Sequence, residues 1–258
     1  NYERLMSEVY ARYVVGITAT PERRDGHQPI IFMQAGPIRH VAKAAGQQEF
    51  EQRVVKRSLY HAPPLEITQE EARPHIADVY RWLMTHEARN QQIVEDVLGN
   101  LSEQRNPILL TERREHAELL GELLGQQGVT YELLRGGMGV KARKAVTERL
   151  ADTQVLIATG KYIGEGFDLP RLDTLFLVLP ISWKGSLAQY AGRIHRQSDG
   201  KERVIIYDYV DYSLPMLERM FRKRQRGYEA LGYTITEPAK EAGLVQSSLQ
   251  LDTPRVPQ

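Results

Sequence analysis

The sequence has no cysteine among its 258 residues. This absence excludes disulfide bonds and zinc sites built on thiolates. The seven histidines show no HxxxH or similar spacing, so they indicate no metal site either. No apolar run approaches the roughly 18 to 20 residues of a membrane span, and no signal peptide is visible. We expect a cytoplasmic protein with no membrane partner.

Strong net charge is also lacking, since 34 lysines and arginines against 33 aspartates and glutamates give +1 at pH 7. A surface for nucleic acid must therefore be a local cluster of basic residues. The last predicted helix carries such a cluster, which contacts phosphates or is merely solvated: Arg219, Arg222, Lys223, Arg224 and Arg226. The hydrophobic share of 41% is sufficient for a core, and the length allows one large domain or two smaller ones.

Apolar strand-like segments and helix-like segments alternate from residue 106 onward. Strands are predicted over residues 107–111, 130–134, 154–158, 172–179 and 204–210, and helices over 113–126, 140–150, 185–197 and 214–231. Ser213 is the expected N-cap of the last helix, and Gly232 is the residue expected to end it. This alternation predicts an α/β fold, a parallel sheet with helices on both faces.

The residues before 106 are less regular. Residues 13–17 are predicted to form a buried strand, residues 30–34 are a short apolar run, and residues 52–61 are a longer strand-like run. Residues 68–101 have helical periodicity and many charges. Periodicity ends after residue 237, which predicts a disordered tail.

A charged stripe marks the helix predicted over residues 185–197. Gln189, Arg193 and Arg196 follow one another at i, i+4 and i+7, so they share one narrow face of a helix. The opposite face is apolar and can dock on a core. Guanidinium groups suit a phosphate chain better than ammonium groups, because their donors form a planar fork. The stripe therefore indicates a partner with concentrated negative charge.

Three segments together resemble conserved motifs of superfamily 2 helicases and translocases. Residues 16–21 (GITATP) are similar to motif III, residues 158–168 (ATGKYIGEGFD) to motif V, and residues 189–196 (QYAGRIHR) to motif VI. The order is that of the family, and the likeness covers most of residues 12–232. The resemblance implies that the predicted sheet is RecA-like.

Two motifs of that family are missing from the sequence. There is no GxxxxGK[ST] phosphate loop and no DExH box. Because the first recognisable motif is the third of the set, we predict a fragment cut between motifs II and III. The predicted domains are the end of a first RecA-like domain, a helical connector, a second RecA-like domain and a disordered tail, over residues 1–61, 62–104, 105–235 and 236–258. The missing N-terminal RecA-like half would bind most of the ATP and Mg²⁺, so the fragment alone should not hydrolyse ATP.

The resemblance also implies roles for individual residues. Arg196 is the expected arginine finger, which stabilises charge on the γ-phosphate, and Arg193 is a second phosphate contact. Further ATP-binding residues are expected at Gln189, Gly166, Asp168 and Glu165. Nucleic-acid contacts are expected at Thr159, Arg113, Gly136 and Gly137, and Thr18 and Thr20 are expected to couple hydrolysis to strand movement. No residue is predicted to be a metal ligand.

Purely structural roles stay open beside these. The arginines could form surface ion pairs, Asp168 could cap a turn, and Thr159 could bond its own backbone at a strand end. Tyr190, next to the charged stripe, could stack on a base or pack under its helix.

We expect the parent protein to be an ATP-dependent helicase or translocase that acts on DNA rather than RNA. Residues 11–36 followed by 163–168 resemble helicases linked to restriction and conflict systems. One alternative is therefore the motor subunit of a restriction complex, with nuclease or restriction subunits as partners. Another is a nucleic-acid-binding or interaction module that keeps the fold without ATPase activity.

Overall fold

The computed structural model describes residues 8, 10–17, 28–41, 50–68, 74–135, 138–160, 169–181, 184–196, 198 and 200–237. Within these ranges seven strands form one sheet in the order β3-β4-β2-β5-β6-β1-β7, and every neighbouring pair is parallel. The strands are β1 Glu51–Leu59, β2 Pro107–Thr111, β3 Tyr131–Leu134, β4 Val155–Thr159, β5 Thr174–Leu177, β6 Arg203–Asp211 and β7 Thr234–Thr236. The helices are α2 Gln28–Ala35, α3 Leu65–Thr68, α4 Ile76–Thr85, α5 Glu87–Ser102, α6 Arg114–Gln126, α7 Val140–Arg149, α8 Lys184–Ile194 and α9 Pro215–Ala230, with a short 3₁₀ helix at Leu150–Asp152.

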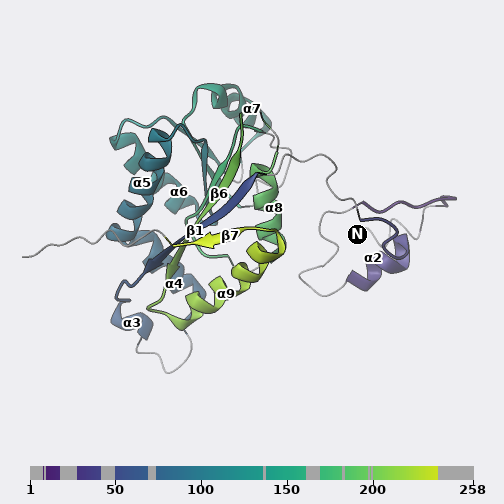
Figure 1. The fold of residues 1–258 in the computed structure, drawn as a ribbon, viewed down its shortest axis with the longest axis horizontal. Helices are drawn as coiled ribbons and strands as arrows, with labels where there is room; N and C mark the ends of the chain where they lie inside the picture. The colour runs from purple at the N-terminus through teal and green to yellow at the C-terminus, as the bar shows by residue number, and fades with distance from the viewer. Residues whose placement is uncertain are drawn as a thin grey trace, which may run out of the picture.

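Helices cover both faces of the sheet. Alternate residues of a strand point to opposite faces, so in β2 Leu110 packs with the cluster under α8 and α9, and Leu109 packs with the cluster under α5 and α6. Figure 1 shows α5 and α6 on one side of the sheet and α8 and α9 on the other. The predicted fold class, a RecA-like parallel sheet with helices on both faces, is confirmed.

The strand predicted over residues 13–17 is absent. This segment has no regular secondary structure and pairs with no strand of the described structure, and Tyr13, Val15 and Ile17 are 76%, 81% and 94% exposed. Residues 30–34 lie in α2, so this apolar run is helical. An apolar run forms a strand only where a neighbouring strand pairs with it, and none of the described elements does so here.

Strand β1 belongs to the main sheet. It pairs with β6 along its whole length, from Glu51 opposite Arg203 to Leu59 opposite Asp211, and its other edge pairs with β7. The predicted division after residue 61 placed this strand in a preceding domain, and the pairing corrects that assignment. Helix α5, expected in a connector, likewise packs its apolar side on the sheet. Periodicity predicts that a strand or helix forms, but not which sheet it joins.

Helix α9 differs from its prediction at its start and along one face. Its N-cap is Leu214 rather than Ser213, and Pro215 occupies the first turn, where a missing N–H costs nothing. Gly232 follows its end with φ at +85°, a conformation that favours glycine. Arg224 is 1% exposed and forms an ion pair with the equally buried Asp208. It is therefore part of the core and not of the predicted basic surface.

Candidate functional site

Helix α8 presents the predicted phosphate-binding arginines. Its apolar face, which includes Leu187 and Ile194, is fully buried against the sheet, as the sequence predicted. Arg193 lies in its last turn, and Arg196 follows two residues after its end, both partly exposed. The helix ends at Ile194 rather than at residue 197, so Arg196 stands on the segment just past the helix. Gln189 lies in the same helix.

The backbone around Arg196 is held by the buried side chain of Lys201. Its ammonium group donates to the carbonyl oxygens of Ile194 at 3.1 Å, Arg196 at 2.6 Å and Pro170 at 2.5 Å. On the neighbouring residue, His195 Nε2 lies 2.6 Å from the Tyr233 hydroxyl. Burial lowers the pKa of His195, and the nearby Lys201 ammonium lowers it further. Sequence reasoning missed Lys201, because a lysine after a glycine in a polar loop carries no pattern.

Seven predicted site residues lie outside the described residues. These are Gly166, Asp168, Glu165, Gly136, Gly137, Thr18 and Thr20. The roles predicted for them remain predictions. The structure does describe Thr159 and Gly160 at the start of the motif V segment, and Leu169 and Pro170, which follow it.

Thr159 and Arg113 lie together at the carboxyl edge of the sheet. Strands β2 and β4 are parallel neighbours in which Thr111 stands opposite Thr159. Arg113 follows β2 by two residues and is the N-cap residue of α6. Its guanidinium lies 5.8 Å from the centre of the Tyr80 ring, a cation–π contact. The structure thus brings together two of the residues predicted to contact nucleic acid.

A buried chain of hydrogen bonds supports the backbone of Arg113. The Arg113 N–H donates to Thr111 Oγ1 at 3.2 Å, and Thr111 Oγ1 lies 3.4 Å from His116 Nδ1. His116 Nε2 is 3.1 Å from Asn90 Oδ1. The side-chain amide nitrogen of Asn90 donates to the carbonyl of Met84 at 2.6 Å. Burial lowers the pKa of His116 to about 3, with the Arg89 charge as a smaller cause. The imidazole is therefore neutral at pH 7, with its proton on Nε2, where Asn90 can accept it.

Tyr190 packs under α8 and touches the start of the motif V segment. It is 6% exposed, so the packing role, and not base stacking, is the one the structure supports. A Cβ atom added to Gly160 would lie 2.7 Å from the Tyr190 hydroxyl. Only glycine allows this approach, because real Cβ contacts do not come this close. The backbone next to Thr159 therefore rests on α8.

The candidate residues form two groups at opposite edges of the sheet. Thr159 and Arg113 stand where strands end. Arg196 stands beside the start of β6, since its carbonyl is bound by Lys201, two residues before that strand. Helix α8 runs between the two edges over about 16 Å. One rigid helix therefore connects the predicted nucleic-acid contacts to the predicted phosphate-binding arginines.

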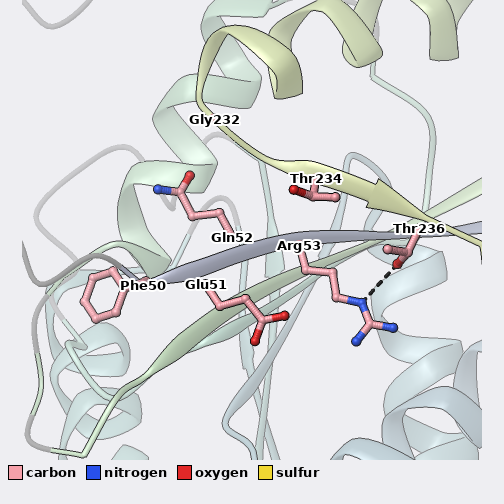
Figure 2. Close-up of a pocket in the computed structure, with 7 residues that line it drawn as sticks. All are labelled: Phe50, Glu51, Gln52, Arg53, Gly232, Thr234 and Thr236. Atoms are coloured by element: carbon pink, nitrogen blue, oxygen red, sulfur yellow. Dashed lines mark hydrogen bonds between the residues drawn. The ribbon is translucent and has the colours of Figure 1, made fainter.

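A pocket at the outer edge of the sheet does not coincide with either group. Figure 2 shows it between the first residues of β1 and the short strand β7. It is lined by Phe50, Glu51, Gln52, Arg53, Gly232, Thr234 and Thr236. Arg53 Nε donates to Thr236 Oγ1 at 2.9 Å across the pocket. Because none of the predicted site residues lines this pocket, we do not assign the function to it.

The described ranges contain neither a membrane-spanning helix nor a metal-binding cluster. No described helix combines the length and the apolar character that crossing a bilayer requires. No group of three or more His, Asp or Glu side chains stands close enough to hold a metal ion in this part of the chain.

Comparison with known proteins agrees with the motifs. Residues 89–198 match the helicase conserved C-terminal domain. The chain is 25% identical over 244 residues to the L396 protein of Acanthamoeba polyphaga mimivirus, whose name proposes an ATP-dependent RNA helicase, with 91% of this chain and 45% of that protein covered. It is 40% identical over 84 residues to the uncharacterized protein 108L of Invertebrate iridescent virus 3, covering 33% of this chain and 76% of that protein.

A solved structure supports the same fold. The crystal structure of T4 UvsW superimposes with a TM-score of 0.56 at 15% identity, covering 73% of this chain and 42% of that one. The chain thus spans less than half of the length of UvsW and of the mimivirus relative. The matched domain contains Arg113, Thr159, Arg193 and Arg196. Residues 89–198 therefore carry a helicase conserved C-terminal domain, which agrees with the resemblance of the motifs to those of superfamily 2 helicases.

Proposed function

We propose that this chain is the second motor domain of an ATP-dependent helicase or translocase. The observation that carries the proposal is the pair of arginines at the end of α8, held on a buried helix of a helicase C-terminal domain. Their guanidinium groups suit the oxygens of a phosphate chain. A preceding RecA-like half would complete the site, and because β1 pairs with β6 we place the start of the second domain before residue 51.

Arg196 would act as the arginine finger in ATP hydrolysis. Its charge would stabilise the negative charge that develops on the γ-phosphate oxygens, and Arg193 would hold the same phosphate chain. Gln189, Glu165, Gly166 and Asp168 would bind the rest of the nucleotide. Mg²⁺ would accompany the ATP and would be held mainly by the other half of the protein.

The carboxyl edge of the sheet would hold the nucleic-acid strand. Thr159 ends β4 and Arg113 follows the neighbouring strand β2, and a hydroxyl and a guanidinium are both typical phosphate contacts. Gly136 and Gly137 would extend this track. Thr18 and Thr20 would couple closure of the two halves to movement along the strand. Closure of the two halves around ATP would move the nucleic-acid contact at Thr159. Helix α8 would transmit this movement, because its Tyr190 lies against Gly160.

We propose DNA as the strand and RNA as the alternative. Phosphate contacts do not separate the two, and the RNA alternative draws on the name of the mimivirus relative. Stimulation of ATPase activity by matched single-stranded DNA and RNA oligonucleotides decides between them. Greater stimulation by RNA would overturn the DNA assignment without affecting the motor assignment.

The test of the motor assignment is the Arg196→Ala variant of the full-length protein. Loss of an arginine finger should lower the nucleic-acid-stimulated kcat for ATP roughly a thousandfold or more. The control is Arg81→Ala, which removes an exposed arginine that pairs with Asp78 on α4 and should leave kcat unchanged. Normal stimulated activity in Arg196→Ala would refute the proposal.

A second test addresses the strand. Arg113→Ala should raise the concentration of nucleic acid needed for half-maximal stimulation and reduce the salt dependence of binding by about one counterion. The maximal kcat should change much less, because this contact is remote from the phosphates of ATP. A variant that lowered kcat alone would instead place Arg113 in the nucleotide site.

A further inference from the structure

The buried side chain of Lys201 links two separate segments of the chain through hydrogen bonds. It is 8% exposed, and its ammonium group has three donors. Two bonds go to the end of α8, at the carbonyls of Ile194 and Arg196, and the third goes to Pro170, just past the motif V segment. Every donor is used, and the three acceptors come from two separate parts of the chain.

A tight turn directs this side chain back toward α8. The N–H of Lys201 donates to the carbonyl of Ser198 at 3.1 Å, and Gly200 has φ at +77°. A positive φ at the third position of a four-residue turn is a conformation that favours glycine. The turn reverses the chain after Arg196, so that the lysine reaches the carbonyl of Ile194 in the last turn of α8 and the carbonyl of Arg196 just beyond it.

The positive charge of Lys201 is favourable at the carboxyl end of α8. The last carbonyls of a helix carry partial negative charge, so a cation is stabilised there. The Phe50 ring lies 5.8 Å from the ammonium nitrogen and covers it. Burial lowers the pKa of Lys201, the nearby Asp173 raises it, and Arg105 lowers it further. A buried ammonium is stable only when its donors are bonded, so these three carbonyls are held at fixed positions around one atom.

We propose that Lys201 is a positioning residue for ATP hydrolysis, which sets the place of Arg196 relative to the motif V segment. The inference rests on the proposed function of Arg196. Arg196 lies two residues past the end of α8. The hydrogen bond from Lys201 holds its carbonyl, and the bond to Pro170 ties the same ammonium to the residues that follow the motif V segment. Lys201 itself does not contact ATP.

The test compares two buried cations at the same edge of the sheet in the full-length protein. Lys201→Met removes the three hydrogen bonds of the ammonium group and keeps an unbranched side chain of similar length. Arg105→Met is the matched control, because Arg105 is also largely buried and bonds to Thr174, Asp173 and Arg203 near the starts of β5 and β6. Both variants are assayed at a temperature where circular dichroism shows them folded.

Lys201→Met should lower kcat for ATP roughly ten- to a hundredfold, since a misplacement of about 1 Å can cost about a hundredfold in rate. KM should change much less, and Arg105→Met should stay within about twofold of wild type. In an Arg196→Ala background, Lys201→Met should have little further effect, because the residue that it positions is gone. Equal loss of kcat in both methionine variants, or full additivity with Arg196→Ala, would overturn the inference.

A second measurement does not depend on ATPase activity. Amide hydrogen exchange at residues 169–172 and 191–196 should be faster in Lys201→Met than in Arg105→Met. Unchanged exchange at these residues would refute the claim that Lys201 holds the two segments together. The failures remain distinguishable: normal activity in Arg196→Ala refutes the proposed function and this inference with it, whereas normal activity in Lys201→Met alone refutes only the inference.

Discussion

The ion pair between Arg224 and Asp208 allows a quantitative test of the fold. Both side chains are 1% exposed. Arg224 Nε and Nη2 donate to the two carboxylate oxygens at 2.7 and 2.8 Å, and Nη1 donates to the carbonyl of Ile181 at 2.7 Å. The Tyr228 hydroxyl adds a bond to Asp208 at 2.7 Å. Asp208→Asn keeps the volume and removes the charge, so it leaves a guanidinium buried without its counterion.

The expected cost is about 3 to 5 kcal/mol, the usual effect of removing one partner from a buried pair. For a domain of this size, each kcal/mol shifts Tm by about 2 to 4 °C, so Tm should fall by roughly 6 to 20 °C. Glu218→Gln is the matched control, because it breaks the exposed pair with Arg222 on α9, the helix that carries Arg224. An exposed i,i+4 pair contributes only about 0.3 to 0.5 kcal/mol.

Urea unfolding followed by circular dichroism measures both variants. The double variant Asp208→Leu with Arg224→Met should recover most of the loss, because an apolar pair of similar volume needs no counterion. If Asp208→Asn destabilises the protein no more than Glu218→Gln, Arg224 lies at the surface, and the packing of α9 described above is wrong.

Two further predictions concern the contacts between the groups of the candidate site. Gly160→Ala should cost about 1 to 3 kcal/mol through overpacking, and the cost should shrink in a Tyr190→Phe background, which lacks the clashing hydroxyl; an equal cost in both backgrounds would contradict the contact. The folded pKa of His116, about 3, lies below its ordinary value of 6.5, so the unfolded state binds more protons between these values. The contribution of neutral His116 to the free energy of unfolding is complete above about pH 6.5. This contribution falls as pH drops, by about 2 kcal/mol at pH 5. Urea unfolding at pH 7 and pH 5 should show this loss in wild type and a smaller loss in His116→Gln, and identical losses would refute it.

The sheet core was predictable because its signal is local. The structure confirms all five strands predicted from residue 107 onward, and all but the partly buried edge strand β3 have the apolar run of a strand buried on both faces. The apolar side of α8 and the end of α9 at Gly232 were likewise visible in the sequence. The segment over residues 13–17 shows the limit, since the same apolar signal there produced no strand.

The candidate site was predictable only in part. The motif positions identified Thr159, Arg113, Arg193 and Arg196, and the structure gathers the first two at one edge of the sheet and the last two at the end of α8. The residues that hold them, Lys201 and His116, gave no signal. Each acts through hydrogen bonds to groups that become neighbours only in the folded chain, such as Pro170, 31 residues before Lys201.

The sequence by itself determined the fold class, the helicase motifs and the side of α8 that faces the sheet, because these depend on residue spacing along one segment. The tertiary structure alone decided the neighbours. It inserted β1 between β6 and β7, placed Arg224 against Asp208 in the core, and brought the Lys201 ammonium to the end of α8. Spacing specifies which face a side chain occupies, whereas the partner on that face depends on contacts between distant segments, which form only when the sheet assembles.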